Sequence, residues 1–461
     1  MRRMSVTLVA AIAGAGTCAM VVVVSAARSA PQQAAQGKPQ TEITFRITGE
    51  PGALPRYAVP EFIPLSPDPD TAAAAKLVAQ VLWNDLAFER EFSLIPRDTY
   101  ASIPRARSMA DVPFERWREL DADALVIGTI QKEGDQFRVA VRLFSVRDRQ
   151  SAFGREYRGA AATPRFFSHS IADEIHQTQV NLRGVARTKL AFVSDRDGER
   201  IKAMFGDRAV KEIYISDYDG ENQHRLTTGR GLNLTPAWSP DGRSLAYTSY
   251  RRGYGDIFIS NIYQGTIPDN PTRGRGESFL PAWSPDGTKL AFTSDRDGNP
   301  EIYVINRDGS GLMRLTSHPA IDVTPTWSPS GMQIAFTSDR TGSPQIYVIS
   351  ADGTGVLRRM TREPYCDRPT WSPPPFNEIA YASRGGGGID VKILDVVTLA
   401  VRQLTFGEGI SESPAFAPNG RHVAFSSTRS GRAQIYLIDR EGKNLTQVTR
   451  AGNNTMPDWS R

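Results

Sequence analysis

The C-terminal two thirds of this 461-residue chain repeat one sequence pattern, and this repeat constrains the fold more than any other feature. In each copy a proline stands two residues before an aromatic residue, and successive copies lie 45, 44, 44, 45 and 43 residues apart. The six aromatic anchors are Trp238, Trp283, Trp327, Trp371, Phe416 and Trp459. Such regular self-similarity indicates an array of one supersecondary unit.

The copy at residues 281–316 shows the nature of that unit. It contains four short runs rich in β-branched and aromatic residues, separated by turn sequences such as Asp286-Gly287 and Asp308-Gly309. These runs predict strands, and Asp-Gly pairs adopt tight turns, so the unit is a four-stranded antiparallel meander. One meander cannot cover both of its faces. The six copies therefore predict an all-β six-bladed propeller over residues 186–461, with the aromatic-bearing strand innermost in each blade.

The two ends of the array predict how the ring closes. The first copy begins at Lys189 and lacks the innermost strand, whereas the chain finishes with an extra strand at residues 455–460. We expect the two segments to complete one blade, because this closure removes exposed strand edges.

Most repeated positions are interpreted as blade packing. A Ser-x-Arg group follows the second strand of several copies, as at Ser294 and Arg296, and is interpreted as charge pairing between neighbouring blades. The segments between blades vary most, which favours them as binding loops on a rigid scaffold. The first blade also carries an insertion at 199–210, expected on the same rim. The apolar residues expected near the channel mouth are Phe279, Leu280, Ile321 and Val323.

Residues 41–185 lack the repeat and predict a small α/β domain, of the α+β type, that is large enough for its own core. A segment capped at Asp70 and continuing through Phe88 has apolar residues at helical spacing, as does the segment 164–180. Strands are expected at 58–62, 92–95, 124–130 and 137–144, and a hairpin turn joins the last two.

The first residues have the layout of an export signal. Arg2 and Arg3 precede an apolar stretch at 6–24, and small residues follow at 25–27, so we expect a signal peptide at 1–27 and a linker at 28–40. Retention of the apolar stretch as a membrane anchor is the alternative. Cleavage would leave Cys366 as the single cysteine and exclude an internal disulfide. We infer a soluble periplasmic protein.

Charge and motifs argue against several classes of function. Lys plus Arg total 55 and Asp plus Glu total 50, with the excess spread along the chain, which disfavours nucleic acid as a partner. The chain contains no G-x-S-x-G nucleophile elbow, its five histidines are scattered, and no H-E-x-x-H motif accompanies them. We therefore predict no enzyme activity, no metal site and no cofactor.

Several segments resemble the TolB family, the periplasmic propeller proteins of the bacterial Tol-Pal system. The resemblance extends over nearly all of the expected mature chain, and its N-terminal domain is the more specific part. The segments that carry it are 42–47, 75–88, 120–128, 169–175, 187–191 and 216–220.

This resemblance implies a non-enzymatic adaptor that supports outer-membrane integrity and cell division, and we expect a monomer. Family members bind the peptidoglycan-associated lipoprotein Pal over the channel mouth, and the inner-membrane protein TolA through the mature N-terminus. Carried over by position, the Pal-facing residues are Glu277, Ser278, Leu280, Asp322, Thr324 and Arg368. The TolA-facing segment comprises Thr41, Glu42, Ile43, Thr44, Phe45 and Arg46.

Two other functions stay open. A metal-dependent polysaccharide-binding or lyase propeller would need His, Glu and Lys or Arg residues clustered around the channel. The other alternative is a paralogous exported scaffold that binds a different protein.

Overall fold

The computed structural model describes residues 38–39, 46–49, 52–203, 206–229, 231–264 and 268–461. The predicted signal peptide, most of the predicted linker and residues 41–45 lie outside the described residues, as do residues 204–205 of the insertion. Cleavage of the signal and its retention as an anchor therefore both stay predictions. The domain boundaries at 41–185 and 186–461 likewise stay predictions.

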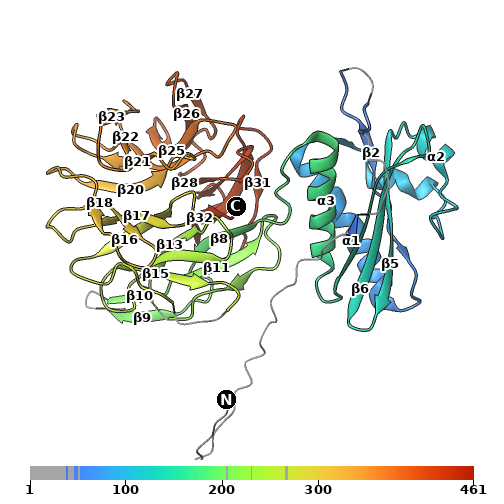
Figure 1. Ribbon diagram of the computed structural model, residues 1–461, viewed down its shortest axis with the longest axis horizontal. Helices are drawn as coiled ribbons and strands as arrows, with labels where there is room; N and C mark the ends of the chain where they lie inside the picture. Colours follow the sequence, from blue (N-terminus) through green and yellow to red (C-terminus); the bar gives the residue numbers. More distant parts are fainter. Residues whose placement is uncertain (1–37, 40–45, 50–51, 204–205, 230, 265–267) are drawn as a thin grey trace, which may run out of the picture. The chain divides into compact units, whose positions relative to one another are not determined.

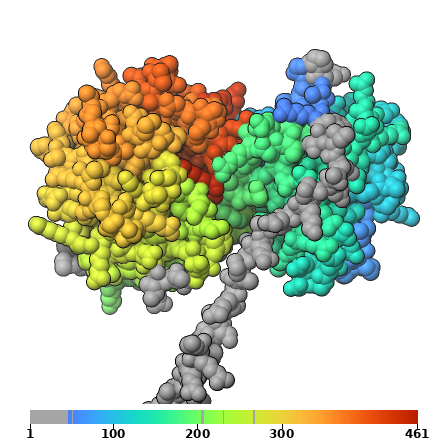
Figure 2. Space-filling model, viewed as in Figure 1, coloured from blue at the N-terminus to red at the C-terminus, as the bar shows by residue number. Residues whose placement is uncertain are grey.

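The repeated region forms six sheets, which confirms the predicted six-bladed propeller (Figure 1). Neighbouring strands of each blade pair antiparallel, and the aromatic-bearing strand lies at one edge of its sheet. Successive blades occupy neighbouring sectors, from lime through yellow and orange to red (Figure 2). The insertion adds a separate hairpin of β9 (Arg200–Ala203) and β10 (Gly206–Ala209).

The blade strands have the following bounds. The first blade contains β8 (Lys189–Ser194), β11 (Glu212–Asp217), β12 (His224–Arg225) and β32 (Asn454–Trp459), and the second contains β13 (Asn233–Trp238), β14 (Ser244–Ser249) and β15 (Asp256–Asn261). The third contains β16 (Ser278–Trp283), β17 (Lys289–Ser294), β18 (Glu301–Asn306) and β19 (Met313–Arg314), and the fourth contains β20 (Asp322–Trp327), β21 (Gln333–Ser338), β22 (Gln345–Ser350) and β23 (Arg358–Arg359). The last two contain β24 (Cys366–Trp371), β25 (Glu378–Gly385), β26 (Gly388–Asp395) and β27 (Val401–Gln403), then β28 (Ser411–Phe416), β29 (His422–Ser427), β30 (Gln434–Asp439) and β31 (Thr446–Gln447).

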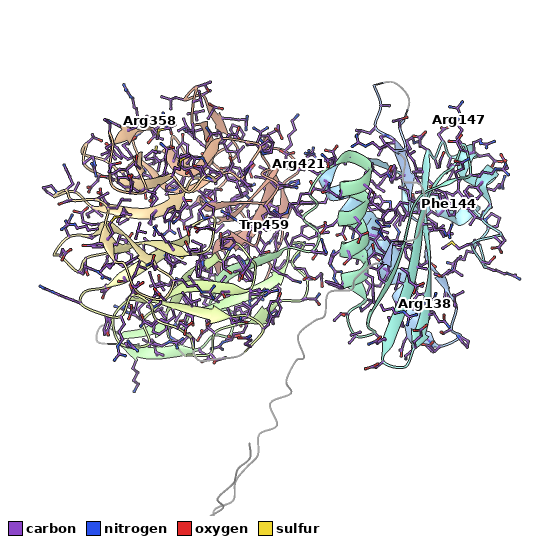
Figure 3. The ribbon with its side chains drawn as sticks, in the orientation of Figure 1. Arg138, Phe144, Arg147, Arg358, Arg421 and Trp459 are labelled. Carbon is purple, nitrogen blue, oxygen red and sulfur yellow. The ribbon has the colours of Figure 1, made fainter. Side chains whose placement is uncertain are left out.

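The ring closes as the two ends of the repeat predict. The final strand, β32, pairs antiparallel with β8 and places Trp459 opposite Leu190. The Trp459 indole N–H donates a hydrogen bond to Thr188 Oγ1 at 2.7 Å. Trp459 lies among the strands of the propeller (Figure 3). The last strand of the chain is thus the innermost strand of the first blade, so the two ends of the propeller hold each other.

The N-terminal domain is built on one sheet with the strand order β1-β7-β6-β5-β2-β4, and β3 also pairs with β5. Its strands are β1 (Lys38–Pro39), β2 (Arg56–Ala58), β3 (Ile63–Pro64), β4 (Ser93–Leu94), β5 (Ala124–Glu133), β6 (Gln136–Ser145) and β7 (Ser151–Ala160). Its helices are α1 (Pro69–Glu89), the short 3-10 helix η1 (Arg97–Ser102), α2 (Phe114–Glu119) and α3 (Pro164–Val180).

Each face of this sheet carries its own hydrophobic core. On one face α1 and α3 pack against the sheet and bury Leu82 and Ile171 completely (Figure 1). On the other face α2 contributes Trp117, which packs with Leu125 and with Phe144 of β6. The predicted hairpin of β5 and β6 and the helix at 164–180 are confirmed.

Two local predictions in this domain are wrong. The α1 N-cap is Asp68 rather than Asp70: Pro69 takes the first helical position, and the Asp68 side chain accepts a hydrogen bond from the Thr71 N–H at 3.0 Å. The strand expected at 58–62 is instead mostly a break between strands, since β2 ends at Ala58 and β3 begins at Ile63. In this break the Phe62 ring packs against Gly128 of β5, where an added Cβ atom would lie 2.2 Å from that ring, so the contact requires a residue without a side chain.

Buried charged groups join α1 and α3 to the propeller. Asp85 of α1 accepts a hydrogen bond from the Tyr218 hydroxyl at 2.8 Å, and its other oxygen lies 2.8 Å from His169 Nδ1. Burial opposes the charged form of His169, but the carboxylates of Asp85 and Asp217 outweigh it and raise the pKa of His169 to about 9. Further contacts join Glu89 to Asn419 and His422, and Arg90 to Asp439.

Candidate functional site: the mouth of the propeller channel

One residue in the innermost strand of every blade has a positive φ angle, between 50° and 58°. These residues, which we call the bulge ring, are Thr235, Leu280, Thr324, Arg368, Ser413 and Met456. Residues other than glycine avoid this region because their Cβ atom crowds the backbone. Each one coincides with a register shift between the first two strands of its blade and precedes a proline. Blade geometry therefore imposes the same strained bulge six times.

The bulge ring surrounds the opening of the channel. Its six residues and the prolines that follow them line a pocket of about 120 Å³. Farther along the same strands, as far as the aromatic anchors, a second space of about 210 Å³ continues the channel. Strained residues persist where the surrounding structure over-determines them, and they gather at binding sites. A ring of such residues around an opening therefore marks it as a candidate binding site.

The bulge ring is chemically uneven although its backbone repeats. Leu280 and Met456 are apolar, and Arg368 is the one charged member. The hydroxyl group of Thr324 donates to Thr337 Oγ1 at 2.8 Å, and those of Thr235 and Thr248 are 2.8 Å apart. The mouth thus combines apolar surface, oriented hydroxyl groups and one positive charge, a mixture suited to a protein surface with apolar and acidic side chains.

Three of the residues predicted to face Pal, namely Leu280, Thr324 and Arg368, belong to the bulge ring. Their predicted location in loops between blades is wrong, since they lie inside β16, β20 and β24. The bulge and the proline interrupt the alternation of residues that identifies a strand, which explains why these segments resembled loops.

Glu277 lies one residue before β16, at the rim of the mouth, and is partly exposed. Its backbone N–H donates to Asp295 Oδ1 at 2.7 Å. A Cβ atom added at Gly255 would lie 3.3 Å from Glu277 Oε2, so this carboxylate reaches the preceding blade. There, burial and the charge of Glu277 both raise the pKa of Tyr250.

Ser278 and Asp322 lie at the beginnings of β16 and β20, where their side chains are 1% and 0% exposed. Asp322 accepts two hydrogen bonds from the Arg340 guanidinium, at 3.0 and 2.8 Å. Ser278 Oγ accepts a hydrogen bond from Arg296 at 3.1 Å. These two side chains therefore support the rim from inside, and their contact with a partner stays a prediction that their burial disfavours.

A family model described as the TolB beta propeller domain matches residues 177–461, more than half of the chain. The chain belongs to the TolB family. A second model, the TolB amino-terminal domain, matches residues 43–152.

Other proteins of the TolB family are similar to this chain over its length or part of it. The Tol-Pal system protein TolB of Desulfosudis oleivorans is 35% identical over 46% of both chains, and that of Nitrosococcus oceani is 34% identical over 48% of this chain and 49% of its own. The chain thus spans about half the length of the curated relatives it matches. The crystal structure of TolB from Acinetobacter baumannii is 26% identical, covers 88% of this chain and 97% of its own, and has a TM-score of 0.74.

The Ser-x-Arg group of this TolB propeller stabilises single blades, so the predicted pairing between neighbouring blades is wrong. Arg340 donates from Nε to Ser338 Oγ at 2.9 Å and reaches Asp322 in the same blade. Its guanidinium lies over the Phe336 and Tyr347 rings, 5.7 and 5.1 Å from their centres. The same stacking recurs at Arg196, Arg296 and Arg429. Adjacent strands place all these groups together, which makes the cation–π contact an intrablade one.

Sequence reasoning assigned no partner contact to Thr235, Ser413 and Met456, the other half of the bulge ring, although the first two lie in the variable segments favoured as binding loops. A signal for them was present: each stands directly before the proline of the Pro-x-aromatic motif, as Leu280, Thr324 and Arg368 do. The positions were hidden because the six residue types differ, and their common feature is a backbone angle.

The inner channel of this TolB propeller contains the carboxylate of Asp458. Burial raises the pKa of Asp458 to about 6, against the hydrogen bond that it accepts from the Trp238 N–H at 2.6 Å. Among the residues that the structure describes, no three His, Cys, Asp or Glu side chains gather so as to hold a metal ion.

The N-terminal segment predicted to bind TolA is described only at Arg46, which is exposed. The next residue, Ile47, donates its backbone N–H to Gln179 Oε1 of α3 at 3.0 Å. In the described ranges of the chain, no helix has both the length and the apolar character needed to cross a bilayer.

Proposed function

We propose that this chain is a periplasmic adaptor of the Tol-Pal system, which binds protein partners and transforms no substrate. Membership of the TolB family, and the identity of the Desulfosudis and Nitrosococcus relatives as Tol-Pal system proteins, support a role in that system. The bulge ring is the observation that carries the proposal, because it offers a rigid and chemically uneven surface around an opening.

In this proposal a Pal-type lipoprotein docks over the mouth of the channel. Leu280 and Met456 bury apolar side chains of the partner, and Arg368 pairs with one of its carboxylates. The bulges hold these groups in place before binding, so little conformational entropy is lost on association. Glu277 adds a charged contact at the rim. The bound lipoprotein would connect this chain to the outer membrane, and through that connection the chain would support outer-membrane integrity and cell division.

A TolA-type inner-membrane protein would bind the segment Thr41 to Arg46. The hydrogen bond from Ile47 to Gln179 supports this assignment, because it attaches the chain to α3 immediately after the segment. The N-terminal segment and the mouth would then contact different partners, which is what an adaptor between two envelope layers requires.

The docking proposal is tested by titrating the purified chain with the soluble domain of a Pal-type lipoprotein from the same organism. Leu280→Ala and Arg368→Ala should each weaken binding by about ten-fold or more and leave the melting temperature unchanged. Arg358→Ala is the matched control, since Arg358 is exposed on β23, the outermost strand of its blade. Unchanged affinity in both mouth variants would contradict docking at the mouth.

The TolA assignment is tested separately by deleting residues 41–46. The deletion should abolish binding of a TolA-type domain and leave the affinity for the Pal-type domain unchanged. If the deletion abolished binding of both domains, or of neither, the assignment of the two partners to separate sites would be wrong.

A further inference from the structure

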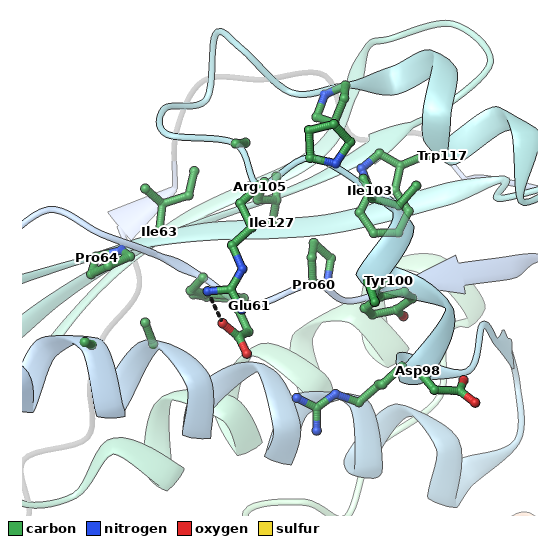
Figure 4. Close-up of a pocket in the computed structure, with 18 residues that line it drawn as sticks. Pro60, Glu61, Ile63, Pro64, Asp98, Tyr100, Ile103, Arg105, Trp117 and Ile127 are labelled. Atoms are coloured by element: carbon green, nitrogen blue, oxygen red, sulfur yellow. Dashed lines mark ion pairs between the residues drawn. The ribbon is translucent and has the colours of Figure 1, made fainter.

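A cavity of about 680 Å³ lies in the N-terminal domain, far larger than the opening lined by the bulge ring. It is bounded by residues 60–64, the first turns of α1, η1 and α2, with Ile127 of β5 contributing to its lining (Figure 4). Residues 60–64, which connect β2 to β3 and include β3, form one wall of the cavity, and residues 103–106 after η1 form part of the opposite side. Its volume falls in the range of roughly 300–1,000 Å³ typical of sites for small ligands.

The inner walls of this pocket are apolar and firmly held. Ile63, Ile127 and Trp117 are 6%, 3% and 3% exposed. The Tyr100 ring packs edge-on against Trp117, with 5.1 Å between ring centres. The Tyr100 hydroxyl accepts a hydrogen bond from the Val59 N–H and donates one to the Ile95 carbonyl, both at 3.0 Å. This hydroxyl is thus occupied by the backbone, so the wall formed by Ile63, Ile127 and Trp117 is apolar. Four charged side chains supply polar groups to the rest of the lining: Glu61, Arg97, Asp98 and Arg105.

A pair of opposite charges lies across the pocket. Arg105 Nη1 is 3.1 Å from Glu61 Oε2, and the two side chains are 84% and 33% exposed. In Figure 4 the Arg105 side chain extends to Glu61 between Ile63 on one side and Tyr100 and Trp117 on the other. Such an exposed pair contributes little to stability, so a ligand can exchange it for its own charges.

The charged side chains around the pocket favour a ligand that has both a positive and a negative group. A ligand with only a carboxylate would pair with Arg105 but leave Glu61 beside a second negative charge. A ligand with only an ammonium group would pair with Glu61 and leave Arg105 unmatched. A zwitterion that inserts between Arg105 and Glu61 can pair its carboxylate with Arg105 and its ammonium group with Glu61, so neither residue is left without a partner. The other two charged residues in the lining, Arg97 and Asp98, have opposite charges, so they add no net charge to the pocket.

We propose that this pocket binds short peptides that have free termini and bulky apolar side chains. The peptide ammonium group pairs with Glu61, its carboxylate forms a two-pronged contact with Arg105, and its side chains lie against Ile63, Ile127 and Trp117. This site lies in a different domain from the bulge ring and does not depend on what binds there.

The proposal is tested by calorimetric titration of the full chain with the tripeptide Leu-Ile-Leu. Ala72 of α1 lines the pocket and is exposed, so Ala72→Trp should fill the entrance and weaken binding by about ten-fold or more without disturbing the core. Ala73→Trp is the matched control, because Ala73 is the next exposed residue of the same helix and does not line the pocket. Thermal melting of both variants checks that they fold.

The chemical class is tested with two further ligands and one further variant. Leu-Ile-Leu with acetylated and amidated ends, and decanoate, should each bind about ten-fold more weakly than the free tripeptide, and Glu61→Gln should remove the preference over decanoate. Absence of tripeptide binding at millimolar concentration, or equal binding by Ala72→Trp and Ala73→Trp, would overturn the site. Equal or tighter binding of either comparison ligand would overturn the recognition of a zwitterion.

Discussion

In the propeller one set of contacts recurs from blade to blade, whereas the N-terminal domain builds each contact once. An arginine stacks on an aromatic pair beside its own second strand at Arg196, Arg296, Arg340 and Arg429. In the N-terminal domain the two faces of one sheet carry different cores, and one face leaves a cavity of about 680 Å³. Repetition thus identifies structural residues, and binding chemistry remains where the copies differ. Without repetition, a candidate site is recognised by the space that packing leaves unfilled.

The largest expected effect comes from opening the ring. Deletion of residues 454–461 removes β32 and the buried Trp459, whose loss alone costs about 3–5 kcal/mol. The melting temperature should fall by at least about 10 °C. Excision of residues 200–209 is the control, because the Val210 N–H already bonds the Glu199 carbonyl at 2.9 Å and closes the base of that hairpin. A truncated chain that melts with the full-length protein would show that closure contributes nothing.

The second expected effect concerns buried and exposed ion pairs in the two regions. Asp322→Ala leaves the Arg340 guanidinium without its buried partner and should lower the free energy of unfolding by about 3–5 kcal/mol in urea titrations. Asp70→Ala breaks the exposed pair with Lys132 in the N-terminal domain and should leave stability near that of the wild type. Similar losses for both would refute the structural role of the buried Asp322–Arg340 pair.

The junction between the two regions should depend on pH. The pKa of His169 is about 9 in the folded protein and about 6.5 when unfolded, so the protonated imidazole stabilises the fold. This contribution to the free energy of unfolding is complete below about pH 6.5 and is lost as the pH rises through 9. Urea titrations between these values should show a decrease of up to about 3 kcal/mol. His169→Gln should abolish this slope, whereas His224→Gln, at an exposed position, should keep it. If His169→Gln left this slope unchanged, the pH dependence of stability would come from a group other than His169.

The smallest expected effect distinguishes a bulge from an ordinary strand. At Leu280, where φ is 58°, glycine should be more stable than alanine by up to about 1 kcal/mol, because glycine has no Cβ to crowd the backbone. At Arg158, inside a regular part of strand β7, alanine should be the more stable by a similar amount. Chemical denaturation of the four variants measures both differences. The same order at both positions would mean that the bulge stores no strain.

The sequence predicts the propeller well because its signal is repeated. Six spaced aromatic residues identify the blades, which the six sheets confirm, and an extra strand at the end identifies their closure, which the pairing of β32 with β8 confirms. In the N-terminal domain the long hairpin and the helix at 164–180 have strong local patterns and are confirmed. The break between β2 and β3 escapes prediction, because the local pattern at 58–62 is that of a strand and the packing of Phe62 against the distant Gly128 has no sequence signal.

The candidate sites are predicted less completely for a related reason. The resemblance predicts that Leu280, Thr324 and Arg368 face a partner, and all three line the mouth. It predicts the same for Ser278 and Asp322, although their side chains are buried. The sequence cannot tell the exposed residues from the buried ones here. Side chains normally alternate between the two faces of a strand, but the alternation is broken at the bulge, and only the strand pairing shows where the bulge lies. The pocket at Arg105 and Glu61 has no sequence signal, since its parts come from segments about 40 residues apart.

The amino-acid sequence alone determined the number of blades, the order of their strands and the strand that closes the ring. These features follow from local propensity and from periodicity, which act over a few residues and then repeat. The tertiary structure alone decided which side of each strand faces the channel, where the bulges point, which ion pairs are buried and where a cavity remains. Those features depend on how segments distant in the chain exclude water and fill space together, a property of packing that no single segment contains.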